Sequence, residues 1–556
     1  MKTCILRACF GLLLIYWQPA LAQLRCADPL AFSVVTQPGR IEWQKFPDFT
    51  LPFPVIFGGP RLGDTNAQPL KHGFSEIVFV DDSEFYRVVQ PNQRALEWTG
   101  FAFGLNQPWE TAESPWNNNL PAYHARWNQW LRDVSGGLKT ASGKYDLQAA
   151  RIMVDIERIQ ETNVRILRLK TDPTTPAVYK TLTDSEFLLR YKRDMVTLYA
   201  QSLQYIRDNA DLTNVPMTTY GDVPIRNTYL NVVGNSWADW TTNPARVHYL
   251  MQDTTTFSKP TGPFEQQLDY LTPSAYYFYD YPNRLAPDYL AYLLFQVEAN
   301  RAWSRKPVVP FVWMRYHDSG DFYPNFIQPF MAEATAIFPF FSGANGLWLW
   351  DIPGFADPNS TLYRPTEVYA PYEHFVHGLY RLSQFSDMFT GAYELVIETP
   401  ARDLMDAQKP VWRGVVKDNK ILIAAQNPYA TTDAQTTSVV IRYRNWQQTI
   451  TLTGRQTYLC QFDLSITATE PTAPDDVQVF PNPGHTTLTV SLGSGLPLPY
   501  PTTLALHDLT GRIVRQQAVA GEQTLVDVRG LSAGVYVLRV GEGAGAVHRR
   551  VVVAPL

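Results

Sequence analysis

Between residues 27 and 390, short apolar runs alternate with longer segments whose apolar residues recur at helical spacing. The runs that predict strands are 51–58, 76–81, 96–103, 151–157, 215–222, 270–278, 307–317 and 346–353. The segments that predict helices are 123–134, 186–209, 287–303 and 326–341. This alternation predicts a mostly parallel sheet. Eight such runs over this length predict an α/β fold, a (β/α)8 TIM-like barrel with its chemistry at the carboxyl ends of the strands.

The segment ARIMVDIERIQ (150–160) places two acids in an apolar run. As a strand it presents Ile152, Val154 and Ile156 on one face, and Arg151, Met153, Asp155 and Glu157 on the other. A helix is also compatible, because Ile152, Ile156 and Ile159 lie four and three positions apart. We favour the strand because other predicted strands end in similar polar or aromatic residues: Tyr220 and Asp222, Tyr276, Tyr316 and His317, and Trp350 and Asp351. The acids then point into the barrel at its catalytic end.

Two small all-β domains are predicted after the barrel, at residues 400–464 and 477–556, from short alternating runs separated by turn residues. Residues 465–476 are rich in Pro, Thr and Ala and predict a linker. For 400–464 we expect an accessory domain that packs on the barrel or binds carbohydrate weakly.

The N-terminus predicts an export signal over residues 1–22, with Lys2 and Arg7 before a short apolar run and Ala20-Leu21-Ala22 at the cleavage site. The run is too short to span a membrane and no second one follows, so we expect no membrane span. Cys26 and Cys460 remain after cleavage. Pairing and two free thiols are both compatible with an oxidising compartment.

Composition narrows the class of partner. Without the export signal, 45 basic side chains face 52 acidic ones, a net charge of about −7. Nucleic acid is therefore not expected, because phosphate binding needs a basic surface. The chain contains 15 Trp, 30 Tyr and 29 Phe, which suits stacking on sugar rings and equally suits a large core.

Three motifs near the C-terminus carry a first family resemblance. They are Phe480-Pro481-Asn482-Pro483, Asp508-Leu509-Thr510-Gly511-Arg512 and Leu531-Ser532-Ala533-Gly534-Val535-Tyr536. Residues 477–556 thereby resemble the sorting domain of the type IX secretion system of Bacteroidetes. The resemblance implies the type IX secretion machinery as a partner and a protein that is secreted or displayed at the cell surface.

The two neighbouring acids suggest glycoside hydrolysis. One of two close carboxyls stays protonated, as an acid that protonates a leaving oxygen must. Acids two apart on one strand stand side by side, which suits substrate-assisted hydrolysis, where the acetamido oxygen of the sugar attacks. The alternative is a retaining hydrolase whose nucleophile lies elsewhere, such as Asp222 or Asp351.

Four motifs resemble strands of the hyaluronidase and chitinase glycosidases, in order over about residues 50–355: MVDIERI, TPSAYY, KPVVPFVWMRYHD and GANGLWLWD. The hyaluronidase resemblance is the closer, because Met153 and Arg151 stand where chitinases carry an earlier Asp and a Gly. It implies Glu157 as the general acid/base and Asp155 as the group that positions the acetamido group. Tyr220 and Tyr276 would bind the reacting sugar, and Trp350 would form the floor of the site that holds this sugar.

Several of these residues have alternatives. Tyr277 replaces Tyr276 if the register slips by one residue, and each tyrosine and Trp350 also suits barrel packing. Arg226 and Arg315 either bind substrate carboxylates or pair with Asp222 and Asp351. We expect no metal at His317, since a polar loop explains it, and no cofactor.

Residues 109–130 are dense in Trp and Asn and predict a segment over the barrel mouth with stacking platforms for sugars. Packing of Trp127 and Trp130 inside a helix is the alternative. The sequence as a whole predicts a secreted endo-acting glycoside hydrolase of the hexosaminidase type with a polysaccharide or glycan substrate. A non-catalytic carbohydrate-binding barrel or adhesin is the other class.

Overall fold

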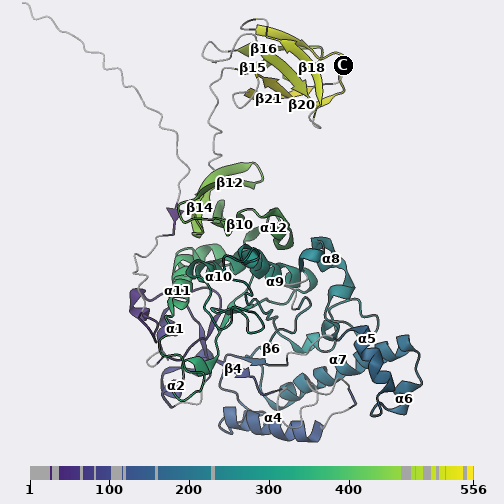
Figure 1. The fold of residues 1–556 in the computed structure, drawn as a ribbon, viewed down its shortest axis with the longest axis vertical. Coiled ribbons are helices and arrows are strands. Elements are labelled where there is room, and N and C mark those ends of the chain that lie inside the picture. Colours follow the sequence, from purple (N-terminus) through teal and green to yellow (C-terminus); the bar gives the residue numbers. More distant parts are fainter. Residues whose placement is uncertain are drawn as a thin grey trace, which may run out of the picture. The chain divides into compact units, whose positions relative to one another are not determined.

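The chain forms two compact units, residues 1–465 and 466–556 (Figure 1). The structure is a computed structural model that describes residues 25–27, 37–62, 67–79, 83–101, 115–116, 120–156, 161–226, 232–464, 477–482, 484–492, 502–508, 512–519, 521, 523–541 and 547–554. The predicted export signal and the predicted linker lie outside the described residues.

A parallel sheet curls around the centre of the first unit in the order β6-β5-β4-β3-β2-β8-β7. Seven of the eight predicted runs contribute a strand to it. The strands are β2 (Val55–Gly58), β3 (Glu76–Val78), β4 (Arg94–Trp98), β5 (Arg151–Val154), β6 (Met217–Thr219), β7 (Phe311–Trp313) and β8 (Leu347–Trp350). Because β2 pairs with β8, the first and last strands of the barrel are neighbours.

The remaining predicted run, 270–278, closes the ring without forming a regular strand. Thr272 bridges to Tyr220 after β6, and Leu271, Ser274 and Tyr277 bridge to the segment around β7, all in parallel. The eight predicted segments therefore surround one interior in chain order, which confirms the α/β barrel.

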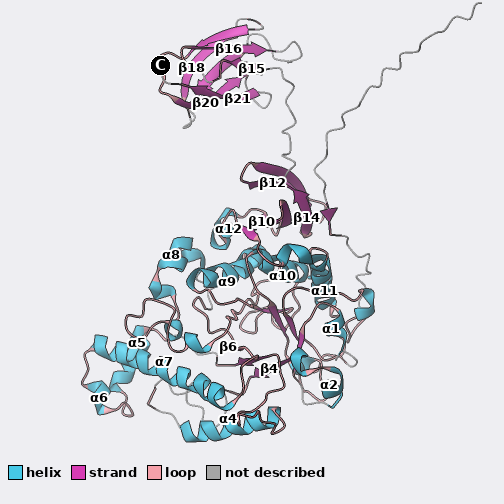
Figure 2. Ribbon diagram, turned by 180° about the vertical axis from the view of Figure 1, so that it is seen from behind, coloured by secondary structure: helices cyan, strands magenta, loops and turns pink. Residues whose placement is uncertain are grey.

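Helices surround this sheet (Figure 2). The four predicted helices are present as α4 (Leu120–Val134), α7 (Asp184–Asn209), α9 (Tyr289–Trp303) and α10 (Pro329–Phe341). In α7, Thr183 and Glu186 form a capping box that satisfies amide groups of the first turn. The other helices are α1 (Gln68–Lys71), α2 (Ser83–Val88), α5 (Asn163–Arg168), α6 (Ala177–Lys180), α8 (Trp237–Thr242) and α11 (Ala370–Ser383).

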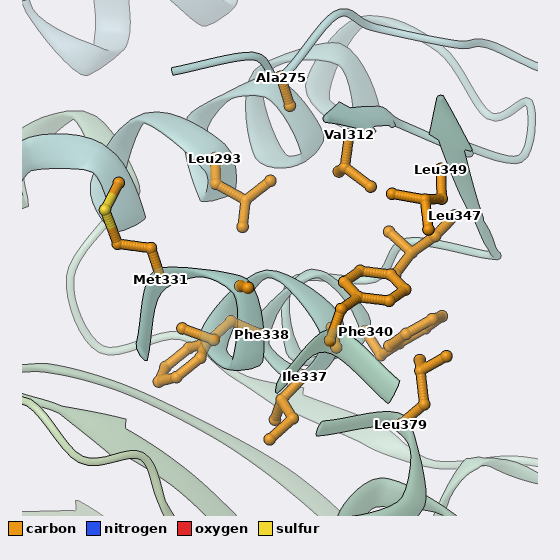
Figure 3. Close-up of a cluster of buried hydrophobic side chains, with 14 of the residues drawn as sticks. Ala275, Leu293, Val312, Met331, Ile337, Phe338, Phe340, Leu347, Leu349 and Leu379 are labelled. Carbon is orange, nitrogen blue, oxygen red and sulfur yellow. The ribbon is translucent and has the colours of Figure 1, made fainter. Parts of the chain in front are cut away.

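The layer between the barrel wall and the helices is almost entirely apolar. In Figure 3, side chains of α9, α10 and α11 converge on the outward-facing side chains of β7 and β8. The labelled residues are Ala275, Leu293, Val312, Met331, Ile337, Phe338, Phe340, Leu347, Leu349 and Leu379. Burial of such side chains stabilises the fold by roughly 1.5–3 kcal/mol each, so this layer holds the barrel strands in place.

The predicted bounds of the third strand were wrong. The sequence predicts 96–103, whereas β4 spans Arg94–Trp98, and the described residues that follow it form a turn. The strand begins directly after a 3-10 turn at Pro91–Gln93. Alternation alone does not define an end when aromatic residues continue past it, as they do at Phe101 and Phe103.

In the region predicted as an accessory domain at 400–464, the structure has an accessory sheet with the order β1-β14-β11-β10-β9 and a hairpin, β12–β13, of which β1 and β9 lie outside those bounds. Its strands are β1 (Arg25–Cys26), β9 (Glu394–Val396), β10 (Val411–Lys417), β11 (Lys420–Gln426), β12 (Thr436–Tyr443), β13 (Trp446–Thr453) and β14 (Tyr458–Asp463). A short helix, α12 (Ala401–Ala407), precedes β10.

The accessory sheet packs on the barrel. One of its faces shares the apolar layer of α9, α10 and α11 through Val415, Leu422 and Leu459. Arg413 of β10 forms a buried ion pair with Glu298 of α9, at 2.8 Å. A disulfide joins Cys26 to Cys460, and the strands that carry them pair in antiparallel register.

The second unit is a small β-sandwich of two antiparallel sheets, β15-β16-β19 and β18-β17-β20-β21. Its strands are β15 (Val477–Phe480), β16 (Thr487–Leu492), β17 (Thr503–His507), β18 (Ile513–Ala518), β19 (Gln523–Asp527), β20 (Gly534–Val540) and β21 (Val547–Val553). Leu488, Val526 and Leu538 are fully buried between the sheets. In neither unit does the described part of the chain contain a helix with the length and apolarity needed to cross a membrane.

Candidate functional site at the carboxyl ends of the barrel strands

The side chains of β5 alternate between the two faces of the sheet, as the strand prediction requires. Ile152, Val154 and Ile156 are fully buried against the surrounding helices, whereas Met153 and Asp155 line a cavity inside the barrel. The Asp155 amide donates to the carbonyl of Trp98 at the end of β4, at 3.1 Å. Asp155 therefore lies just past the carboxyl end of its strand. Glu157 lies outside the described residues.

The cavity has a volume of about 120 Å³. It is smaller than the roughly 300–1,000 Å³ of a drug-sized site, so its volume suits a single ring of a larger ligand. Five of its lining residues are aromatic, in addition to His317. The lining residues are Thr99, Met153, Asp155, Tyr220, Tyr276, Phe311, Trp313, His317, Asp318 and Trp350.

Tyr220, Tyr276 and Trp350 form a row of roughly parallel rings. The centroids of Tyr220 and Tyr276 are 6.0 Å apart at 29°, and those of Tyr276 and Trp350 are 6.0 Å apart at 18°. The Tyr220 hydroxyl donates to Ser274 Oγ at 3.0 Å. Rings arranged in this way offer flat apolar surface with hydroxyl groups at their edges, which suits the two kinds of surface on a sugar.

The structure also shows which of the two neighbouring tyrosines, Tyr276 or Tyr277, faces the interior of the barrel. Tyr276 lines the cavity. Tyr277 points outward, where its hydroxyl lies 2.6 Å from Thr335 Oγ1 of α10 and burial raises its pKa. Tyr277 therefore joins the barrel to its helix layer.

Arg315 and Asp351 do not line the cavity and instead form a buried network behind it. Arg315 Nε donates to Asp351 at 3.0 Å, and its two terminal nitrogens donate to Glu367 at 2.8 and 2.6 Å. Asp351 also accepts from Trp313 Nε1 at 2.8 Å and from the Tyr372 hydroxyl at 2.7 Å. The network thereby positions Trp313, whose ring meets Trp350 edge-on at 4.8 Å.

Two carboxylates, Asp351 and Glu367, surround the single guanidinium of this network. Burial opposes the charge of Arg315, but Asp351 and Glu367 outweigh burial and raise the pKa of Arg315. Burial next to Asp351 raises the pKa of the Tyr372 hydroxyl. Arg315 is thus paired with Asp351, as the pairing alternative predicts.

Asp222 and Arg226 form a second pair outside the cavity lining. The two side chains are 3.2 Å apart, Asp222 is fully buried, and Arg226 is 10% exposed. This is again the pairing alternative for the arginine.

Six lining residues were not among the predicted site residues: Thr99, Met153, Phe311, Trp313, His317 and Asp318. Alternation along 307–317 provides a pattern that identifies three of them. Val312, Met314 and Tyr316 pack outward, so Phe311, Trp313 and His317 share the inward phase with Arg315.

A further carboxyl lies deeper in the barrel, at Glu97 of β4. Glu97 is level with Met153 of β5, and it accepts a hydrogen bond from Trp348 Nε1 at 2.6 Å. Burial raises its pKa to about 7, although the Trp348 bond and the charge of Arg61 act in the opposite direction. A Cβ on Gly58 would come within 3.1 Å of this carboxyl, so the glycine leaves room for it.

The raised pKa of Glu97 predicts a pH-dependent stability. Its carboxyl loses a proton at about pH 4.5 in the unfolded chain but at about pH 7 in the fold. The protonated carboxyl therefore contributes fully to the free energy of unfolding below pH 4.5. This contribution is lost as pH rises to about 7, by at most about 3 kcal/mol. Glu97→Gln keeps an oxygen for Trp348. The difference in unfolding free energy between variant and wild type should grow from pH 5 to pH 8, measured by urea denaturation. A constant difference would contradict the assignment.

The segment predicted to cover the barrel mouth is only partly described. Trp127 is fully buried and stacks on Phe101 at 4.5 Å, and Trp130 stacks on Trp98 at 3.7 Å. These two residues pack α4 against the barrel, which is the packing alternative. The preceding residues 102–114, with Trp109, lie outside the described residues.

Residues 478–554 match the family described as the secretion system C-terminal sorting domain. This confirms the resemblance of the C-terminal motifs. The protein is secreted or held at the cell surface. A comparison with curated protein sequences finds no match for the chain.

Among solved structures, the chain is similar to bee venom hyaluronidase with 15% identity and a TM-score of 0.35, covering 54% of this chain and 91% of that chain. It is also similar to the glycoside hydrolase family 30 subfamily 8 xylanase Xyn30A of Clostridium acetobutylicum, with 14% identity, a TM-score of 0.30, and coverage of 77% and 97%. A modular endo-β-1,4-mannanase of Cellulomonas fimi follows, with 11% identity, a TM-score of 0.28, and coverage of 89% and 80%. At these identities the similarity concerns the fold alone.

Proposed function

We propose that this protein is a secreted glycoside hydrolase that cleaves its glycan next to an N-acetylhexosamine by substrate-assisted, retaining catalysis. The observation that carries the proposal is the cavity at the carboxyl ends of the strands, where Asp155, Tyr220, Tyr276 and Trp350 meet. Barrel enzymes keep their reacting groups at this end.

The proposed reaction needs one protonated acid and one carboxylate, here two residues apart in the chain. The Glu157 carboxylic acid protonates the glycosidic oxygen as the bond to the anomeric carbon breaks, and the acetamido oxygen of the substrate attacks that carbon. Asp155 accepts the acetamido N–H and stabilises the cyclic intermediate. Glu157, now a carboxylate, takes a proton from water, and the water opens the ring with retention.

The aromatic residues have binding roles in this mechanism. Trp350 and Tyr276 provide parallel faces for the reacting sugar. The hydroxyl groups of Tyr220 and Tyr276 bind its acetamido group. Asp222 and Asp351, the alternative nucleophiles, are each paired with a buried or nearly buried arginine, which favours the substrate's own oxygen as the nucleophile.

A thiazoline analogue of the cyclic intermediate tests this mechanism. We expect it to bind at least about 10²-fold more tightly than the matching substrate, because it resembles a state between the two transition states. Inhibition constants measured on an N-acetylglucosamine oligomer give the comparison. The glucose counterpart, which lacks the acetamido group, is the control and should not be hydrolysed. Hydrolysis of that counterpart would point to a carboxylate nucleophile, and an absence of new reducing ends from every glycan would point to a binding protein.

A further inference from the structure

We infer that the cavity selects electrically neutral N-acetylhexosamine glycans and rejects polymers that carry uronic-acid carboxylates. The inference rests on the proposed function and adds the substrate class to it. It concerns the charge that surrounds the bound sugar, which the described lining residues determine together.

The described lining of the cavity is acidic. It contains the carboxyl groups of Asp155 and Asp318, whereas lysine and arginine are absent from these residues. Asp155 is 8% exposed, and the side chain of Asp318 is 66% exposed at the rim. A substrate carboxylate in this position would face like charges at both depths.

The two arginines that could have bound substrate carboxylates, Arg226 and Arg315, are paired with protein carboxylates. Arg226 pairs with Asp222 at 3.2 Å. Arg315, with a fully buried side chain, pairs with Asp351 at 3.0 Å and with Glu367 at 2.6 Å. Recruiting either arginine for a substrate would leave a buried carboxylate without its partner, which is strongly unfavourable.

His317 adds no net positive charge to the lining, because it is paired with an acid. Its Nδ1 lies 3.0 Å from Asp318 Oδ1 and 3.1 Å from the amide nitrogen of Ser319. The ring stacks on Phe278 at 4.6 Å, which fixes its plane. Burial lowers the pKa of His317, although Asp318 opposes this effect. A charge on His317 would therefore be offset by the adjacent Asp318.

The amino-acid composition of the barrel segments outside the described residues adds more negative than positive charge. Residues 63–66, 80–82, 102–114, 117–119, 157–160 and 227–231 contain a single basic residue, Arg158. Their acidic residues are Asp64, Asp81, Asp82, Glu110, Glu113 and Glu157.

The same lining suits a neutral sugar. Carboxylates at two depths accept from hydroxyl and amide groups, and the parallel rings cover the apolar face of a pyranose. Like charges brought together at a binding site disfavour binding, whereas neutral polar groups do not incur this cost.

The test compares hexasaccharides of equal length: β-1,4-linked N-acetylglucosamine, hyaluronan and chondroitin. We expect kcat/KM for the neutral hexamer to exceed that for either acidic one by at least about 100-fold in 50 mM salt. Raising the salt to 1 M should increase the rate on hyaluronan several-fold, because salt screens the repulsion. The rate on the neutral hexamer should change by less than about twofold.

Asp318→Asn identifies the source of the discrimination. This variant should reduce the preference for the neutral hexamer by about 3–10-fold and weaken the salt effect on hyaluronan. Asp321→Asn is the matched control, because Asp321 is exposed on the same loop and is not a lining residue. It should leave both quantities unchanged.

The outcomes separate this inference from the proposed function. Equal or faster cleavage of hyaluronan would overturn the inference and leave the hydrolase proposal standing. If no hexamer is cleaved but calorimetry shows that the neutral one alone binds, the neutral selectivity holds and the catalytic proposal fails. If none is cleaved and none binds, both are wrong.

Discussion

Hydrolysis of a natural glycan by the Glu157→Gln variant is expected to fall by about 10³-fold with no change in folding. The amide keeps the shape of the side chain but cannot protonate the glycosidic oxygen, and general acid catalysis contributes about 10²–10⁴-fold. Initial rates by reducing-end assay give the loss, and thermal unfolding gives the stability. Binding of the substrate by calorimetry should stay within a few-fold of wild type.

The leaving group provides a sharper measure of the same role. The leaving group of a 4-nitrophenyl glycoside departs with little protonation. Glu157→Gln should therefore slow the cleavage of this glycoside less than the cleavage of a bond to a sugar leaving group. Glu394→Gln, an exposed glutamate of the accessory sheet, is the control and should retain full activity. Activity within tenfold of wild type on the natural glycan would exclude Glu157 as the acid.

Replacement of Arg315 is expected to produce the largest loss of stability among single changes near the cavity. Arg315→Met leaves Asp351 buried without its cation, and breaking one side of a buried pair costs about 3–5 kcal/mol. Equilibrium unfolding of wild type and variant measures this loss. A substrate-binding arginine predicts the reverse, with unchanged stability and a raised KM.

A second substitution makes this test specific to the pair. Asp351→Asn in the Arg315→Met background removes the unpaired charge and still accepts from Trp313. The double variant should therefore be more stable than Arg315→Met alone, and the coupling energy follows from the double-mutant cycle. Strictly additive losses would contradict the network.

Local periodicity predicts which face of a segment is buried, and it succeeds where one face is apolar. It placed Asp155 inward because Ile152 and Val154 belong to the outward face. It left the register of Tyr276 and Tyr277 open, and the structure places Tyr277 outward. It does not report partners that are distant in the chain. Glu367, which pairs with Arg315, lies 52 residues further along, and no pattern in the sequence connects them. For the same reason the sequence did not distinguish a substrate arginine from a structural one.

The pairing of Cys26 with Cys460 was open for the same reason, and the addition of β1 to the accessory sheet was not foreseen. A strand of two residues has too little pattern to be recognised. Its position depends on β14, whose residues are more than 400 positions away. The barrel segment 270–278 shows the opposite error of prediction. It was predicted as a strand, but it closes the ring through isolated bridges.

The disulfide also has a kinetic consequence. Cys26 and Cys460 are separated by 434 residues, and contacts of such separation form slowly because the whole intervening chain must be closed into a loop. Once oxidised, β1 cannot leave its place without displacing β14, so fraying of the first strand is coupled to opening of the accessory sheet. Reduction should therefore accelerate amide exchange at β1 and β14 before it affects the barrel. Outside the cell, where thiols oxidise, this bond keeps the two distant segments of the first unit together.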